Sequence, residues 1–224
     1  MVAIKFLTLV FILFISVTVS AQIYEFREVE GTGMSDVGGP AKWNFTIGED
    51  SYEILANGLG TRTTAAKRST AFTIPIAKDE LLTRSIFWAK YETDVVFVYE
   101  VSDGPSGGGG AIRLNGATLK PRWKKVADIG GFNVSRGLIE NQEAYLAAHG
   151  FVGRLDLDTG VYLWKHDGLY RKFTKKGAFN TFELPEIEGE MVIFTETANV
   201  DRPNILVIDK STGKIIRSVV DGGK

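Results

Sequence analysis

Short apolar runs separated by turn residues dominate the chain after residue 21. Some of these runs alternate apolar and polar positions, and others are continuous stretches of Val, Ile, Phe and Tyr no longer than one strand. Both patterns are typical of β-strands, and no later stretch keeps the 3.6-residue spacing of an amphipathic helix. We therefore predict an all-β protein. The strands expected from the pattern are residues 23–29, 43–47, 52–55, 71–75, 94–100, 143–149 and 190–196.

Three of these strands belong to a repeated unit. They begin at Asp94, Glu143 and Glu190, and each is followed by a second strand that leads into a hairpin. A strand-rich repeat of roughly 40–50 residues predicts propeller blades. The hairpins cover residues 113–123, 154–164 and 207–217, and their aligned positions are Asn115, Asp156 and Asp209, then Thr118, Thr159 and Thr212, then Leu119, Gly160 and Gly213, and finally Trp123, Trp164 and Arg217.

The hairpin motif Asp-x-x-Thr-Gly-x-x-x-Trp resembles the blade motif of the quinoprotein, or PQQ-type, β-propeller family. Residues 154–164 match this motif, residues 207–217 lack the Trp, and residues 113–123 lack the Asp and the Gly. The resemblance implies blades in which the Trp docks between neighbours, so we expect Trp164 to be buried there. For a catalytic member it also implies bound PQQ, Ca²⁺-binding carboxylate and amide groups, and a catalytic Asp.

The chain has room for about four blades at this spacing. A strand at 52–56 would start the first, most divergent blade. Three arrangements are open: a small closed ring, an open array with an exposed blade face, and a half-propeller that pairs with another copy. Propellers avoid leaving a strand edge unpaired, and a ring would need an N-terminal strand in its last blade. We expect residues 23–29 to pair with the C-terminal blade in this way.

Residues 1–21 have the pattern of a secretory signal peptide. Lys5 precedes an apolar run at 6–19, and small residues stand before Gln22. The run is shorter than the roughly 20 residues that a membrane-spanning helix needs. We therefore predict cleavage before Gln22 and an exported protein, periplasmic or secreted, with no stable membrane anchor. The β-propeller-like domain is expected to cover residues 22–224.

Composition narrows the chemistry. A formal net charge of −1 argues against nucleic acid as a partner. The chain has no Cys, hence no disulfide and no thiol nucleophile, and no plausible Ser-His-Asp spacing. His149 and His166 lie near strand ends without companions at metal-ligand spacing. We therefore predict no catalytic residues, no metal site and no cofactor.

Three further features have structural explanations. Turn chemistry accounts for Asp156 and Asp158 better than Ca²⁺ binding does. The basic stretch at 58–70 could hold an anion, but we expect a solvated loop. The glycine-rich stretch at 103–110 lacks the Lys-Ser/Thr ending of a phosphate loop, so we expect a flexible hairpin loop whose last glycines tolerate substitution. The cationic residues of the basic stretch are Arg62, Lys67 and Arg68.

The function expected from these patterns is that of an exported, non-catalytic binding or scaffold protein. Loops on a rigid scaffold commonly carry recognition, so a protein or a saccharide held by rim loops is the expected partner. Homo-oligomers fit the same interpretation. The alternative is a quinoprotein-type oxidoreductase, either partial or completed by oligomerisation, because a fold alone does not decide the chemistry.

Overall fold

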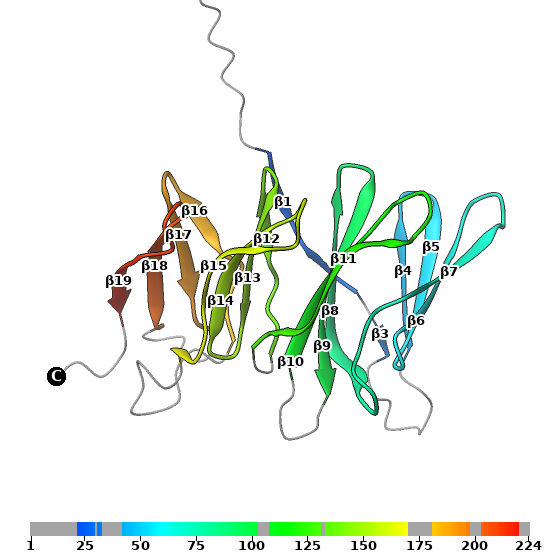
Figure 1. The fold of residues 1–224 in the computed structure, drawn as a ribbon, viewed down its shortest axis with the longest axis horizontal. Helices are drawn as coiled ribbons and strands as arrows, with labels where there is room; N and C mark the ends of the chain where they lie inside the picture. The colour runs from blue at the N-terminus through cyan, green and yellow to red at the C-terminus, as the bar shows by residue number, and fades with distance from the viewer. Residues whose placement is uncertain are drawn as a thin grey trace, which may run out of the picture.

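The computed structural model describes residues 22–29, 31–32, 42–102, 108–130, 133–169, 181–197 and 203–219. The expected signal peptide, residues 1–21, lies outside the described residues. The described residues form four antiparallel sheets that follow one another along the chain. Figure 1 shows the sheets side by side in a row, and we number them blades 1 to 4 from the N-terminal end. The all-β class and the four-blade array are as predicted.

Each blade is a meander of four strands. Blade 1 contains β4 (Lys42–Ile47), β5 (Asp50–Leu55), β6 (Leu59–Thr63) and β7 (Ser69–Thr73). Blade 2 contains β8 (Leu81–Tyr91), β9 (Asp94–Ser102), β10 (Gly108–Leu114) and β11 (Pro121–Ile129). Blade 3 contains β12 (Leu138–Glu140), β13 (Glu143–Ala148), β14 (Phe151–Asp156) and β15 (Tyr162–His166). Blade 4 contains β16 (Glu186–Glu188), β17 (Met191–Thr195), β18 (Ile205–Asp209) and β19 (Ile215–Val219).

The N-terminal segment crosses three blades instead of completing the fourth. We call the described residues 22–29 and 31–32 the strap. Its strand β1 (Ile23–Glu25) pairs with β12 of blade 3, β2 (Arg27–Glu28) with β8 of blade 2, and β3 (Gly31–Thr32) with β4 of blade 1. The expected pairing of residues 23–29 with the C-terminal blade is therefore wrong.

Apolar cores lie between successive blades. One cluster of buried side chains joins blades 1 and 2, a second joins blades 2 and 3, and a third joins blades 3 and 4. Among the described residues no cluster joins blade 4 to blade 1, and these two blades lie at opposite ends of the row (Figure 1). Of the three arrangements that the sequence left open, the structure is the open array.

The repeated hairpin turns have one geometry. In each turn an Asp or Asn oxygen accepts hydrogen bonds from the backbone N–H and the hydroxyl of the Thr three residues later. The next residue has positive φ, at 57° for Leu119, 67° for Gly160 and 71° for Gly213. This local bonding closes the turn, and glycine suits the left-handed backbone. The alignment predicted from the sequence is confirmed, including the Leu in a glycine position.

An arginine and a tryptophan fasten one blade to the next, and we call this contact the latch. Trp123 of blade 2 donates its indole N–H to the carbonyl oxygen of Leu157 in blade 3 at 2.7 Å. Trp164 of blade 3 donates to Lys210 in blade 4 at the same distance. The arginine of each pair donates to the same turn, from Arg113 to Leu157 at 2.9 Å and from Arg154 to Lys210. The predicted burial of Trp164 between blades is confirmed, since its side chain is 9% exposed.

The end of the glycine-rich stretch is strand, not loop. Residues 103–107 lie outside the described residues, but Gly108, Gly109 and Gly110 begin β10 and are buried. A Cβ atom on Gly110 would lie 2.4 Å from the ring of Tyr99. The absence of a side chain lets that ring pack against the backbone, so the expected tolerance to substitution is wrong at this position.

Candidate functional site

The strap is anchored by two buried side chains. Phe26 is 1% exposed and packs in the cluster between blades 2 and 3, while Val29 is 2% exposed and packs between blades 1 and 2. The backbone N–H of Phe26 donates to Gly137 at 3.1 Å, and that of Val29 donates to Ile86 at 2.8 Å. The strap therefore follows the inner edges of the blades, and the side chains of residues 22–25, 27 and 28 are exposed.

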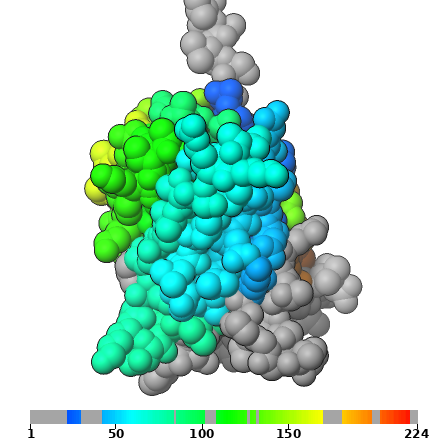
Figure 2. Space-filling model, turned by 90° about the vertical axis from the view of Figure 1, so that its right-hand side faces the viewer, coloured from blue at the N-terminus to red at the C-terminus, as the bar shows by residue number. Residues whose placement is uncertain are grey.

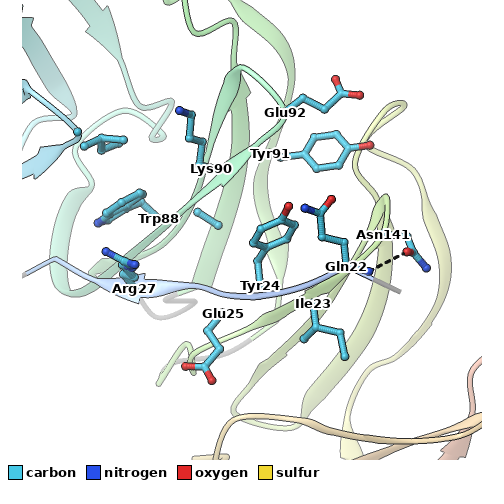
Figure 3. A pocket seen from close by; sticks show the side chains of 13 residues that line it. Gln22, Ile23, Tyr24, Glu25, Arg27, Trp88, Lys90, Tyr91, Glu92 and Asn141 are labelled. Carbon is cyan, nitrogen blue, oxygen red and sulfur yellow. Dashed lines mark hydrogen bonds between the residues drawn. The ribbon is translucent and has the colours of Figure 1, made fainter. Parts of the chain in front are cut away.

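A groove opens between the strap and the hairpin that joins β8 to β9, and we call it the strap groove. Its volume is about 710 Å³. Figure 3 shows Gln22 and Tyr24 on the same side of the strap as Tyr91, whereas Ile23 and Glu25 point the other way. Sequence segments that are far apart therefore meet here. The side chains that line the groove include Gln22, Tyr24, Trp88, Lys90, Glu92 and Asn141.

The strap groove combines one accessible ring with several polar groups. Tyr24 is 38% exposed, whereas Trp88 is 8% exposed and has the Arg27 guanidinium 5.6 Å from its ring centre. Asn141 accepts a hydrogen bond from the Gln22 backbone N–H at 3.3 Å and returns one from its own N–H at 2.9 Å. The exposed side chains of Lys90 and Glu92 add a donor and an acceptor of opposite charge.

Tyr91 forms a structural wall of the groove. Its hydroxyl donates to Asp158 at 3.2 Å, and the Arg113 guanidinium lies 4.7 Å from its ring centre. Burial first, and then the charge of Asp158, raises the pKa of Tyr91 to about 12. A phenol with that pKa stays protonated near neutral pH, so it can donate a hydrogen bond but cannot act as a general base.

The basic stretch does not form an anion site. Arg62 lies in strand β6, is 9% exposed, and donates to the carbonyl oxygens of Gly116 and Ala117 in blade 2. Arg62 therefore has the same role between blades 1 and 2 as the latch arginines, Arg113 and Arg154, have at the next two junctions. Lys67 and Arg68 lie apart from it in the exposed turn after β6. The expected solvated loop at 58–70 is wrong for Leu59–Thr63 in β6 and for residues 69–70, which begin β7, and right for the turn between these strands.

The other sequence candidates are separated from one another. Asp156 holds the hairpin turn, and Asp158 bonds Arg113 at 2.7 Å and Tyr91. A ring nitrogen of His166 lies 2.7 Å from the carbonyl oxygen of Gly213 in blade 4, and His149 lies at the end of the β13–β14 hairpin. Within the described ranges no three His, Asp or Glu side chains come together as metal ligands.

The described residues contain neither a helix that could span a membrane nor a group of three His, Asp or Glu side chains that could hold a metal ion. The resemblance to quinoproteins implies PQQ with Ca²⁺, which needs several carboxylate and amide oxygens directed at one point. The described side chains offer no such set, because the acidic residues beside the strap groove stand singly. They therefore do not fit the group, and we derive no chemical step through it.

Sequence reasoning did not single out the strap groove. The alternation at 23–29 marks a half-buried strand, but no local signal says that it crosses the inner edges of three blades. Trp88 and Asn141 belong to different blades and approach the strap only through its remote pairing. The sequence around Arg62 is polar and turn-rich, so it predicted a solvated loop and not the buried arginine that the structure shows.

Comparisons with known proteins give remote structural similarity. No family model matches the chain, and no curated protein matches it. Among solved structures, a europium-containing methanol dehydrogenase is 14% identical over 66% of this chain and 25% of its own length, with a TM-score of 0.38. Sqt1 of Saccharomyces cerevisiae is 10% identical over 77% of this chain and 48% of its own, with a TM-score of 0.43.

A third similar structure is BamB from Moraxella catarrhalis. It is 9% identical over 86% of this chain and 67% of its own length, with a TM-score of 0.36. The chain thus spans about a quarter of the first structure, half of the second and two thirds of the third.

Proposed function

We propose that this chain is an exported, non-catalytic binding protein built from quinoprotein-like blade repeats, and that it binds a saccharide in the strap groove. The observation that carries the proposal is the grouping of the Tyr24 ring with amide and charged side chains on one rigid concave surface. An aromatic face packs against the apolar face of a sugar ring, while amide and charged groups bond its hydroxyls.

The size of the groove favours a small ligand over a protein surface. Its volume of about 710 Å³ lies within the range of roughly 300–1,000 Å³ that is common for small-molecule sites. A stable protein–protein interface instead buries about 800 Å² on each partner. The blade cores and the strap pairing hold the groove open without a ligand, which reduces the entropic cost of binding.

Binding is tested by screening the protein on an array of neutral and acidic oligosaccharides, followed by titration calorimetry with the best binder. Replacing Tyr24 with Ala should weaken binding by about tenfold or more, since a stacking contact of roughly 1.4 kcal/mol is lost. Leu59→Ala is the matched control, because Leu59 is 52% exposed on blade 1, away from the groove. Equal affinities for the wild type and Tyr24→Ala would contradict the proposed site.

Export is supported by the sequence pattern of residues 1–21 and by the position of Gln22. Cleavage before Gln22 would leave the new terminus at the first residue of the strap, beside its partner Asn141. Mass spectrometry of the protein from the exported fraction should show a chain that begins at Gln22. A predominant intact chain that begins at Met1 in the membrane fraction would contradict export with cleavage.

A further inference from the structure

The outer face of blade 1 is mainly polar, and its apolar residues are Leu55, Leu59 and Ala71. It points away from blade 2, forms one end of the row, and is the end that Figure 2 presents. Its strands alternate between core residues directed at blade 2 and outward residues that are mainly hydroxyl-bearing. Lys42 and Glu53 form an ion pair on it. Such a face is well hydrated. Its outward residues include Asn44, Thr46, Ser51, Thr61 and Thr63.

The outer face of blade 4 has the opposite character. Val192, Phe194, Leu206 and Ile208 have no exposed surface and pack toward blade 3. Because side chains alternate along a strand, the intervening residues point away from blade 3. These residues are half-buried, belong to none of the three core clusters, and are mostly apolar. We call this surface the open face. Its half-buried apolar residues are Met191, Ile193, Ile205 and Val207, and Val219 of β19, which is 44% exposed, lies beside Ile205 on the same face.

One row of side chains crosses the open face from edge to edge. Glu186 of β16 stands opposite Ile193 of β17, Ile193 opposite Val207 of β18, and Val207 opposite Arg217 of β19. The row therefore begins with a negative charge, continues with two apolar side chains and ends with a positive charge. When a second copy of this face is laid against the first with its row reversed, each charged side chain faces one of opposite charge. Each apolar side chain of the row then faces the other apolar one.

We propose that the open face binds the open face of a second copy of this chain, about a two-fold axis parallel to the strands. That axis sets Glu186 of one copy opposite Arg217 of the other and Ile193 opposite Val207. Packed sheets lie about 10 Å apart, a separation at which facing side chains interdigitate. An interface of this kind uses the same patch on both copies, so it closes as a dimer.

In a head-to-tail arrangement, blade 4 would dock on blade 1 of another copy. Such a junction would lack the arginine and tryptophan hydrogen bonds that join successive blades within the chain. At the internal junctions an arginine or a tryptophan reaches into the turn of the next blade. In blade 4 the aligned positions hold Val207 and Arg217, so the arginine–tryptophan pair is absent. The blade 1 face would bring hydroxyl groups against apolar side chains, which costs free energy when they are left unpaired. The missing contacts at a head-to-tail junction, together with the complementary charges at the two ends of the Glu186–Arg217 row, favour the two-fold dimer.

Sedimentation equilibrium of the exported protein, residues 22–224 after the proposed cleavage, over a range of concentrations tests the dimer. The wild type should show reversible dimerisation, and Ile193→Asp should weaken it by about tenfold or more, because a desolvated charge replaces an apolar contact. Thr61→Asp is the matched control on the blade 1 face and should leave dimerisation unchanged. Circular dichroism and thermal midpoints verify that both variants are folded, and a variant that is not is replaced by Val207→Asp.

A charge exchange tests the orientation. Glu186→Arg or Arg217→Glu alone should weaken the dimer, because each sets like charges opposite one another. The double variant should return to within about threefold of the wild-type affinity, a difference of about 0.65 kcal/mol. Three results overturn the proposal: a wild type that stays monomeric, dissociation caused by Thr61→Asp, which indicates head-to-tail contact, or failure of the double variant to recover.

Discussion

Trp164 of blade 3 donates its indole N–H to the backbone carbonyl of Lys210 in blade 4, with 2.7 Å between nitrogen and oxygen. The ring covers Gly213, where a Cβ atom would lie 2.5 Å from the Trp164 Cγ atom. Trp123 bonds Leu157 and covers Gly160 in the same way one blade earlier. The hairpin motif thus has two separate roles, with the Asp, Thr and Gly forming a turn and the Trp of the preceding blade docking on it.

Removing the Trp164 ring should strongly destabilise the fold. Trp164→Ala loses a buried ring and a hydrogen bond and leaves a cavity, which typically costs about 3–5 kcal/mol of unfolding free energy. Leu163→Ala is the neighbouring control, because Leu163 is 49% exposed. Urea denaturation measures both variants. An unchanged midpoint for Trp164→Ala would show that the docking contact contributes nothing to stability.

A substitution at Gly213 separates two reasons for a turn glycine. Gly213→Ala introduces both a positive-φ alanine and a collision with the Trp164 ring, so it should cost more than the roughly 1–2 kcal/mol of backbone strain alone. Gly48→Ala is the control, because Gly48 has a φ of +63° and nothing within 4 Å of the added Cβ atom. Thermal denaturation of the two variants gives the difference. Equal losses would indicate that the ring yields without cost.

The stability of the junction between blades 2 and 3 should depend on acid pH through Asp94. This carboxylate is 1% exposed and bonds Arg113 at 2.7 Å, the Gly116 N–H at 3.1 Å and Arg122 at 3.2 Å. Burial on its own raises the pKa of Asp94, but the Gly116 N–H and the arginines together lower it below the ordinary value. A lowered folded-state pKa gives stability above the unfolded pKa, and that stability is lost as the pH falls through the folded pKa.

Asp94→Asn should therefore destabilise the protein near neutral pH by roughly 3 kcal/mol or more, because Arg113 loses its buried counter-ion. The difference between wild type and variant should shrink as the pH falls below about 4, where the unfolded-state carboxyl protonates. Denaturation midpoints over that range provide the measurement. A difference that is constant with pH would show that the charge of Asp94 is irrelevant.

The stability of the strap's attachment to the blades should depend on Phe26 more than on the exposed residues of the strap. Phe26→Ala removes a side chain that is 1% exposed between blades 2 and 3, with an expected cost of about 3–5 kcal/mol. Ile23→Ala is the control on the same strap, because Ile23 is 52% exposed. Hydrogen exchange at the amides of Phe26 and Val29 should also quicken in Phe26→Ala. Unaltered exchange at both amides would show that the strap is held without this anchor.

Local motifs explain the part of the fold that the sequence could predict. The Asp156–Thr159–Gly160 turn is closed by contacts within a few residues, so its pattern repeats visibly at Asp209–Thr212–Gly213. The strands beside it are apolar and β-branched, and they predicted the blade repeat. The burial of Trp164 followed from the resemblance to propeller blades.

Remote pairing explains what the sequence could not predict. The strap strands are only two or three residues long, and their partners in β12, β8 and β4 have no motif that marks them. The strap pairs with blades 1 to 3 and not with blade 4 because Phe26 packs between blades 2 and 3 and Val29 packs between blades 1 and 2. The strap groove exists only after this choice, so Tyr24 and Asn141 could not be assigned to one site from the pattern.

The separation of blade 1 from blade 4 is the most direct test of the open row. The chain has no native Cys, so spin labels can be attached through Ala66→Cys in the exposed turn of blade 1 and Lys214→Cys in blade 4. Dilution with unlabelled protein restricts the measurement to pairs within one chain. Ala66→Cys with Ala117→Cys gives the reference distance for neighbouring blades, because Ala117 lies in the turn of blade 2.

Double electron–electron resonance on these two pairs gives the distances. In the open row the blade 1–blade 4 pair spans three interblade steps, each about 10 Å. Its distance should exceed the reference by roughly 20 Å, with a single narrow distribution. A distance equal to that of the neighbouring pair would mean that blade 4 closes onto blade 1, and would contradict the open row.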